Sequence, residues 1–176
     1  LYSILCTARF LTSGICSLPF CSVNIDTSFS MPGFFGSFSI FSSYLMSLNP
    51  SIVFVGMETW WSNKPEQEYD KYMRLVIERI LESGAVPIIA TKADNMEGDH
   101  SINATIAQLA YEYDIPLWNF WAAVQPLPDQ GLSEDRFHLT FARNFFDDPK
   151  RMENAWPWRN LTALQALDAV RIGLQE

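Results

Sequence analysis

The acid and the imidazole in the segment Asp135-Arg136-Phe137-His138-Leu139-Thr140 are the side chains best suited to chemistry in this chain. An Asp three residues before a His can hydrogen-bond one ring nitrogen of the imidazole, which fixes the tautomer and leaves the other nitrogen free to act as a base. The segment predicts a pair in which His138 is the general base and Asp135 orients it. The spacing alone is a weak signal, and a structural or surface role for His138 is the alternative.

Three further residues are candidates for binding a substrate. Glu58 and Trp60 follow an apolar run at residues 51–57, and Asn95 follows a second run at residues 86–91. Trp60 suits a sugar ring or an acyl chain, because Trp is common at such sites, and Glu58 suits a cationic or hydroxyl-rich group. The alternatives are packing under a loop for Trp60, holding of the loop for Glu58 and a turn-forming role for Asn95.

Alternating strand and helix patterns bring these residues to one crevice. Continuous apolar runs predict buried strands, and apolar stripes at helical spacing predict amphipathic helices. The expected strands are 51–57, 86–91 and 115–121, the expected helices are 69–81, 102–113 and 161–174, and a polar loop is expected at 126–135. This order predicts an α/β fold with a parallel sheet and helices on both faces. Ligands of such sheets bind beyond the carboxyl ends of the strands.

The start of the chain differs in composition from the rest. Residues 1–50 contain only two charged side chains, Arg9 and Asp26, and all three cysteines. The pattern there shows neither helical periodicity nor clean strand alternation. We therefore divide the chain into an atypical low-charge segment at 1–46 and a domain at 47–176.

Three interpretations of the segment 1–46 stay open. Polar residues, Gly14 and Pro19 interrupt it too often for about 20 apolar residues in a row, so we expect no membrane span. Three cysteines leave one unpaired in any disulfide framework within the chain. The Ser, Phe, Leu and Cys bias is also what a pyrimidine-rich stretch gives when it is translated in a shifted frame, and the third interpretation is that the segment is non-native.

Composition and missing motifs exclude several classes of function. The net charge is −8 and no basic patch is present, which argues against a nucleic-acid partner. No glycine-rich nucleotide-binding motif occurs. The two histidines, His100 and His138, are 38 positions apart and form no ligand set. We expect no metal and no cofactor, and we expect His100 to be an exposed loop residue.

The order of elements and the Asp-x-x-His-Leu-Thr block before the last helix resemble the SGNH/GDSL hydrolase superfamily. The stretches NPSIVFVGME, ATKADNMEGDHSINATIAQLAYEYDIPLWNFW and DRFHLT resemble one bacterial branch of it. The resemblance covers about residues 44–176. It implies a flavodoxin-like three-layer α/β/α sandwich and hydrolysis of esters or acyl groups, without a metal, through a Ser, a His and an Asp. Because that family places the acid and the base in one block, the resemblance implies these roles for Asp135 and His138.

The chain departs from the family pattern at two places. It contains no Gly-Asp-Ser block, so the nucleophile is not identified. The block Gly56-Met57-Glu58-Thr59 has Glu58 where the family has an Asn that donates to the oxyanion. An ionised Glu brings no N–H donor, and loss of one such donor costs about 10²–10³ in rate. Asn95 is a candidate replacement for that donor.

Two hypotheses follow for the function. The first is an SGNH-type hydrolase that cleaves an ester or acyl group of a small molecule or a carbohydrate. The second is a catalytically inactive binding module on the same fold, or a fragment of an active hydrolase. The resemblance favours an exported or extracellular bacterial protein, although the sequence by itself does not give the compartment.

Overall fold

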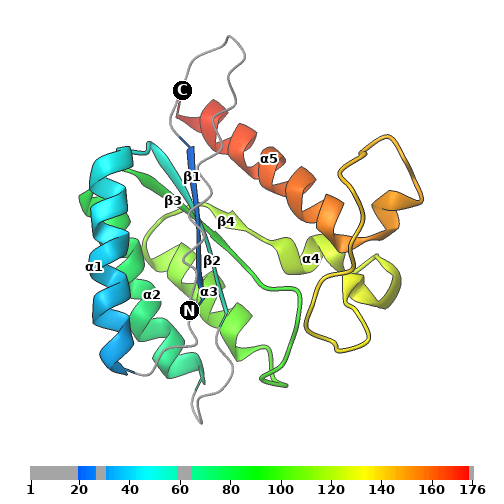
Figure 1. Ribbon diagram of the computed structural model, residues 1–176, viewed down its shortest axis with the longest axis horizontal. Helices are drawn as coiled ribbons and strands as arrows, with labels where there is room; N and C mark the ends of the chain where they lie inside the picture. The colour runs from blue at the N-terminus through cyan, green and yellow to red at the C-terminus, as the bar shows by residue number, and fades with distance from the viewer. Residues whose placement is uncertain (1–19, 27–30, 59–64, 175–176) are drawn as a thin grey trace.

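A four-stranded parallel sheet forms the centre of the protein. The computed structural model describes residues 20–26, 31–58 and 65–174. The strands are neighbours in the order in which they occur in the chain (Figure 1). They are β1 (Phe20–Asp26), β2 (Ile52–Glu58), β3 (Val86–Ala90) and β4 (Leu117–Trp118). All pairs are parallel, so the carboxyl ends of the strands lie at one edge, as the sequence predicts.

Helices connect the strands and cover the sheet. The described residues form α1 (Met31–Leu48), α2 (Pro65–Glu82), α3 (Ser101–Glu112), α4 (Phe120–Val124) and α5 (Ala155–Gly173), with short 3-10 turns η1 (Pro128–Gly131) and η2 (Arg151–Glu153). In Figure 1, α1 and α2 lie on one side of the sheet and α5 lies on the other. No helix in the described part of the chain combines the length and the apolar character that a membrane span requires.

The alternation of side chains along β2 divides the core in two. Val53 and Val55 point to one face, where they pack with buried residues of α1, α2 and α3. Ile52 and Phe54 point to the opposite face, where they pack with residues of β4, α4 and α5. Both faces of β2 are therefore covered, which explains why the strand is a continuous apolar run.

The first part of the chain contains regular structure that its sequence pattern does not predict. All seven residues of β1 pair with β2, from Phe20 opposite Ile52 to Asp26 opposite Glu58. The buried side chains of Phe41 and Leu45, four residues apart in α1, pack against the core. Helix α1 also runs through residues 46 and 47, where the composition of the chain changes.

Two elements near the end of the chain differ in length from the sequence prediction. The strand expected at 115–121 is only two residues long, because Asn119 ends it and caps α4 by accepting a hydrogen bond from the Ala122 N–H at 3.1 Å. Helix α5 begins at Ala155, six residues before the expected start. Its first two N–H groups donate to Thr140, from Ala155 to Oγ1 at 2.9 Å and from Trp156 to the carbonyl at 3.0 Å. A partner distant in sequence therefore starts this helix.

The packing of α3 predicts a large difference between two substitutions on that helix. Ile106 is fully buried and Tyr111 is 88% exposed. Ile106→Ala should lower the free energy of unfolding by about 2–5 kcal/mol, because it leaves a cavity in the core. Tyr111→Ala, the control, should change it by less than about 0.5 kcal/mol. Urea unfolding measures both, and equal losses would contradict this description of the core.

Candidate active site

The structure brings Asp135 and His138 together as the sequence predicts. Asp135 Oδ2 lies 2.5 Å from His138 Nδ1. Asp135 Oδ1 accepts hydrogen bonds from the backbone N–H groups of Phe137 and His138, both at 3.0 Å. Both side chains of the pair are accessible, with 50% exposure for Asp135 and 73% for His138. The carboxylate therefore fixes both the local backbone and the orientation of the imidazole.

These hydrogen bonds keep Asp135 ionised. The bond to the His138 side chain, followed by the two backbone N–H donors, lowers the pKa of Asp135 to about 2. A carboxylate that accepts several donors is stabilised in its charged form. The His138 Nε2 atom has no partner among the described residues. An oriented imidazole with one free nitrogen can take or give a proton.

A tight loop holds the pair, and Thr140 anchors that loop to α5. Leu132 and Leu139 form an antiparallel bridge, and the Ser133 N–H donates to the His138 carbonyl at 2.8 Å. The Thr140 hydroxyl donates to the Gly131 carbonyl at 3.1 Å while it accepts from the start of α5. The loop thus has fixed connections at both of its ends.

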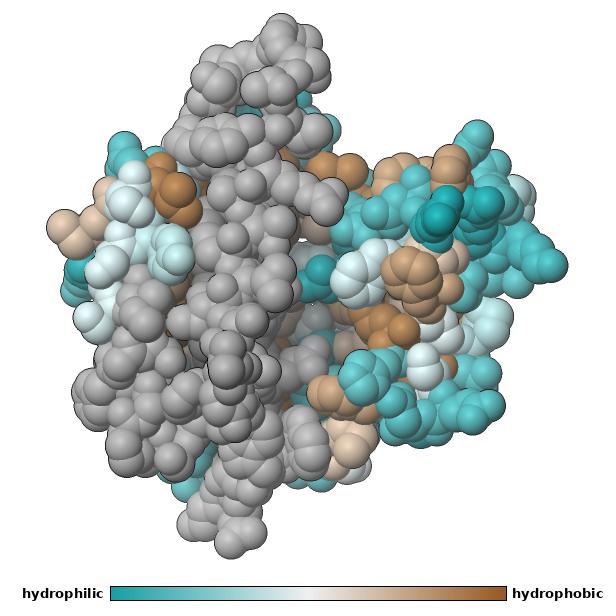
Figure 2. Space-filling model, viewed as in Figure 1, coloured by the Kyte–Doolittle hydropathy of each residue, from teal (hydrophilic) through white to brown (hydrophobic). Residues whose placement is uncertain are grey.

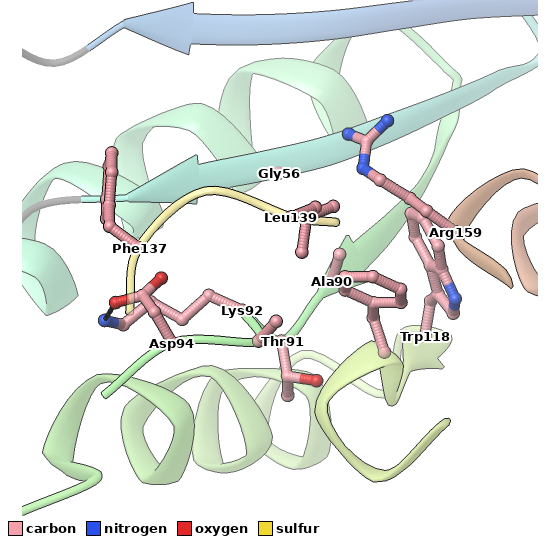
Figure 3. Close-up of a pocket in the computed structure, with 11 residues that line it drawn as sticks. Gly56, Ala90, Thr91, Lys92, Asp94, Trp118, Phe137, Leu139 and Arg159 are labelled. Atoms are coloured by element: carbon pink, nitrogen blue, oxygen red, sulfur yellow. Dashed lines mark hydrogen bonds and ion pairs between the residues drawn. The ribbon is translucent and has the colours of Figure 1, made fainter. Parts of the chain in front are cut away.

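A cavity of about 90 Å³ lies beside the loop at the carboxyl ends of the strands (Figure 3). Gly56 of β2, Ala90 of β3 and Trp118 of β4 contribute to its wall. Phe137 and Leu139, the two neighbours of His138 in the chain, also line it. The cavity and the acid–histidine pair therefore share one short segment of backbone.

A buried lysine forms the polar side of this cavity. The Lys92 ammonium lies 2.6 Å from Asp94 Oδ1 and 2.5 Å from Glu97 Oε2, and all three side chains are at most 2% exposed. The Asn103 side chain bonds the Lys92 backbone at both its N–H and its carbonyl. Lys92 and Asp94 line the cavity. Because buried charges are costly unless paired, this cluster holds the loop after β3 in one arrangement.

The other predicted binding residues do not gather around the cavity in the described structure. Asn95 does not line it and is bonded to His100 instead, with Oδ1 accepting from the His100 N–H at 2.9 Å and Nδ2 lying 3.1 Å from Nε2. This geometry fits the turn-forming alternative. Glu58 ends β2 opposite Asp26, and its side chain lies outside the described residues, as does the whole of Trp60.

Exposed aromatic rings follow the acid–histidine pair in the chain. Phe141 is 70% exposed, and its ring centre lies 6.0 Å from that of Trp156. The Arg159 guanidinium lies 5.9 Å from the Trp156 ring centre and 5.8 Å from that of Trp118, which lines the cavity. Apolar groups also show between hydrophilic ones in the right half of Figure 2. Aromatic rings and the Arg159 guanidinium thus form a series of contacts from the cavity to the surface.

Sequence reasoning missed the Lys92 cluster and this aromatic surface. A Lys just after a strand is ordinarily solvated, and the acids two and five residues later were the only signal of its burial. No group of three His, Cys, Asp or Glu side chains in the described ranges is arranged to hold a metal ion. A scan against protein-family models gives no match for the chain, and a search of the curated proteins gives none. Function is therefore argued from the geometry.

A side chain at Gly131 should destabilise the fold by steric clash as well as by backbone strain. A substitution at Gly98, where the backbone is similar but no atom is close, measures the strain alone. Gly131 has a φ of 74°, and a Cβ there would lie 2.6 Å from the buried Ala155 Cβ, whereas Gly98 has a φ of 88° with no atom within 4 Å. Gly98→Ala should cost about 1–2 kcal/mol through its left-handed backbone. Gly131→Ala should cost about 1–3 kcal/mol more through overpacking. Thermal unfolding compares them, and equal effects would contradict the contact with α5.

The acid–histidine pair predicts an unusually acidic carboxyl group. NMR titration should find Asp135 with a pKa of about 2, below the ordinary value of about 3.9. Because the pKa is lowered by folding, the stabilisation from ionised Asp135 is complete above about pH 4 and is lost as the pH falls through about 2. In His138→Ala the pKa should rise only part of the way, since the two backbone donors remain. An ordinary pKa in the unsubstituted protein would contradict the geometry.

Proposed function

We propose that this chain is an SGNH-type hydrolase domain that cleaves an ester or acyl group of a small molecule or a carbohydrate. The observation that carries the proposal is the Asp135–His138 pair, with Nε2 free among the described residues, beside a cavity at the carboxyl edge of a parallel sheet. This is the edge at which α/β folds bind their ligands. The exposed rings of Phe141 and Trp156 support a sugar-bearing substrate.

The fold that the proposal implies is a flavodoxin-like three-layer α/β/α sandwich. Two observations support it. Core residues pack on both faces of β2, against α1, α2 and α3 on one face and against α4 and α5 on the other. The strand order also equals the flavodoxin-like order 2-1-3-4-5 without its outer strand.

The proposed reaction uses a serine and a water molecule. The serine oxygen attacks the carbonyl carbon of the ester while His138 Nε2 takes the hydroxyl proton, and Asp135 stabilises the imidazolium that forms. The carbon–oxygen bond to the alcohol then breaks, and His138 gives its proton to the departing oxygen. Water attacks the acyl-serine in the same way, so the products are a carboxylic acid and an alcohol.

A binding module without turnover is the second candidate function. None of the described residues that line the cavity is a serine. The hydroxyl of the one threonine there, Thr91, already accepts from the Trp121 N–H at 2.9 Å and lies 3.3 Å from Asn119 Oδ1. A Glu at position 58, in place of an oxyanion donor, also favours binding over catalysis.

Labelling with a fluorophosphonate, which reacts only with an activated serine, separates the two functions. We expect one serine to be labelled, and peptide mapping names it. His138→Ala should abolish labelling, and Asp135→Asn should slow it about 10⁴-fold because the imidazole loses its correct tautomer. His100→Ala is the matched control: the His100 ring contacts Asn95 and Trp121, neither of which lines the cavity, so the substitution should leave labelling unchanged.

The absence of labelling would favour the second function. A folded protein that melts cooperatively, takes up no fluorophosphonate and hydrolyses no ester is not a serine hydrolase. Binding of an oligosaccharide by calorimetry, unaffected by His138→Ala, would then identify the binding module.

A further inference from the structure

The cavity beside the Asp135–His138 loop has a buried ion pair on one side and mainly apolar groups on the other. Lys92 and Asp94 lie together on the side below Phe137, and Ala90, Trp118 and Leu139 lie toward the other side (Figure 3). The Trp118 indole N–H donates to Thr162 Oγ1 at 3.0 Å, so its hydrogen-bonding group is already satisfied. The side of Ala90, Trp118 and Leu139 therefore offers hydrocarbon and ring surface to a ligand, and the Arg159 guanidinium, which also lines the cavity, lies 5.8 Å from the Trp118 ring centre.

The polar side retains a donor. An ammonium has three N–H groups, and Lys92 uses two of them for Asp94 Oδ1 and Glu97 Oε2. The described residues provide no partner for the third. Phe137 lines the cavity on the same side as Lys92 (Figure 3), and its ring centre lies 5.0 Å from that of His138. A small ligand with one polar end and one apolar end would take a single orientation here.

The volume of the cavity limits the size of that ligand. About 90 Å³ is roughly three fifths of the 150 Å³ of an engineered cavity that binds benzene, a ligand of six heavy atoms. An acetyl group has three heavy atoms and a propionyl group has four. The wall cannot expand easily, because Ala90 and Trp118 belong to strands and are each only 7% exposed.

We infer that the cavity is an acyl pocket for esters whose acyl group has two or three carbon atoms. The carbonyl end lies toward Lys92 and Phe137, and the methyl end lies toward Ala90 and Trp118. The leaving alcohol extends toward the exposed Phe141 and Trp156. This inference rests on the proposed function and adds the substrate class: acetic or propionic esters, hydrolysed by water to the short acid and the free alcohol.

A series of p-nitrophenyl esters from acetyl to octanoyl tests the inference. We expect kcat/KM to be highest for acetyl or propionyl and to fall by about 10-fold or more for each further methylene, the discrimination that a pocket with a well-packed wall provides. Leu139→Ala enlarges the pocket and should move the optimum to butyryl or longer. Ala90→Val narrows it and should lower the rate for propionyl more than for acetyl.

A matched control separates pocket size from core packing. Leu127 packs against the same core cluster as Leu139 but does not line the cavity. Leu127→Ala should leave the order of preference among the esters unchanged. A rate that is flat or increases from acetyl to octanoyl would overturn the acyl-pocket inference while leaving the proposed hydrolase in place.

A binding measurement tests the pocket even when no ester is hydrolysed. N-methylacetamide and N-methylhexanamide carry the same polar group on a short and a long acyl chain. The short amide should shift the NMR methyl signals of Ala90 and Leu139, and the long amide should not. Perturbation by neither amide, or by both equally, would overturn the inference; perturbation by the short amide without any turnover would keep the pocket and reject the hydrolase.

Discussion

The parallel register of the strands is the constraint on which the rest of this structure depends. Since β1, β2, β3 and β4 run in the same direction, the backbone leaves each of them at one edge of the sheet. Gly56, Ala90 and Trp118 reach the cavity for this reason alone. A shift of one residue in β2 would exchange the faces to which Val53 and Ile52 point, and so would mix the two halves of the core. Core packing therefore fixes the geometry of the cavity as well as the fold.

The buried ammonium of Lys92 has a structural effect that reaches beyond its own loop. The side chain turns back to bond acids two and five residues later, so the segment 92–97 folds around a single charge. Without that charge, the buried carboxylates of Asp94 and Glu97 would have no cation to pair with, which is strongly unfavourable. The cluster accordingly makes the polar side of the cavity rigid. A rigid polar group can orient a ligand without first being ordered by it.

Features that depend on local sequence were predictable, and features that depend on distant partners were not. The predictions of α2 from its apolar stripe and of β2 from its apolar run were correct, because both patterns depend only on neighbouring residues. The Asp135–His138 contact spans only three positions, so the spacing and the place of the segment after the third expected strand together predicted it. The start of α5 at Ala155 depends on Thr140, fifteen residues away, and no sequence pattern near Ala155 indicates it. The pairing of the low-charge β1 with β2 also depends on residues that are distant in sequence.

The local character of the acid–histidine pair also explains why it cannot by itself decide between catalysis and binding. All three donors to Asp135, two backbone N–H groups and the imidazole, come from residues 137 and 138, so the loop orients His138 without help from the rest of the site. Such a pair keeps its geometry whether or not a nucleophile stands opposite. Catalysis needs in addition that a ligand carbonyl be held near the pair. Leu139 joins the loop to Leu132 through its backbone and lines the cavity through its side chain. In the proposed hydrolase, one residue would thus connect the loop of the acid–histidine pair to the wall of the acyl pocket.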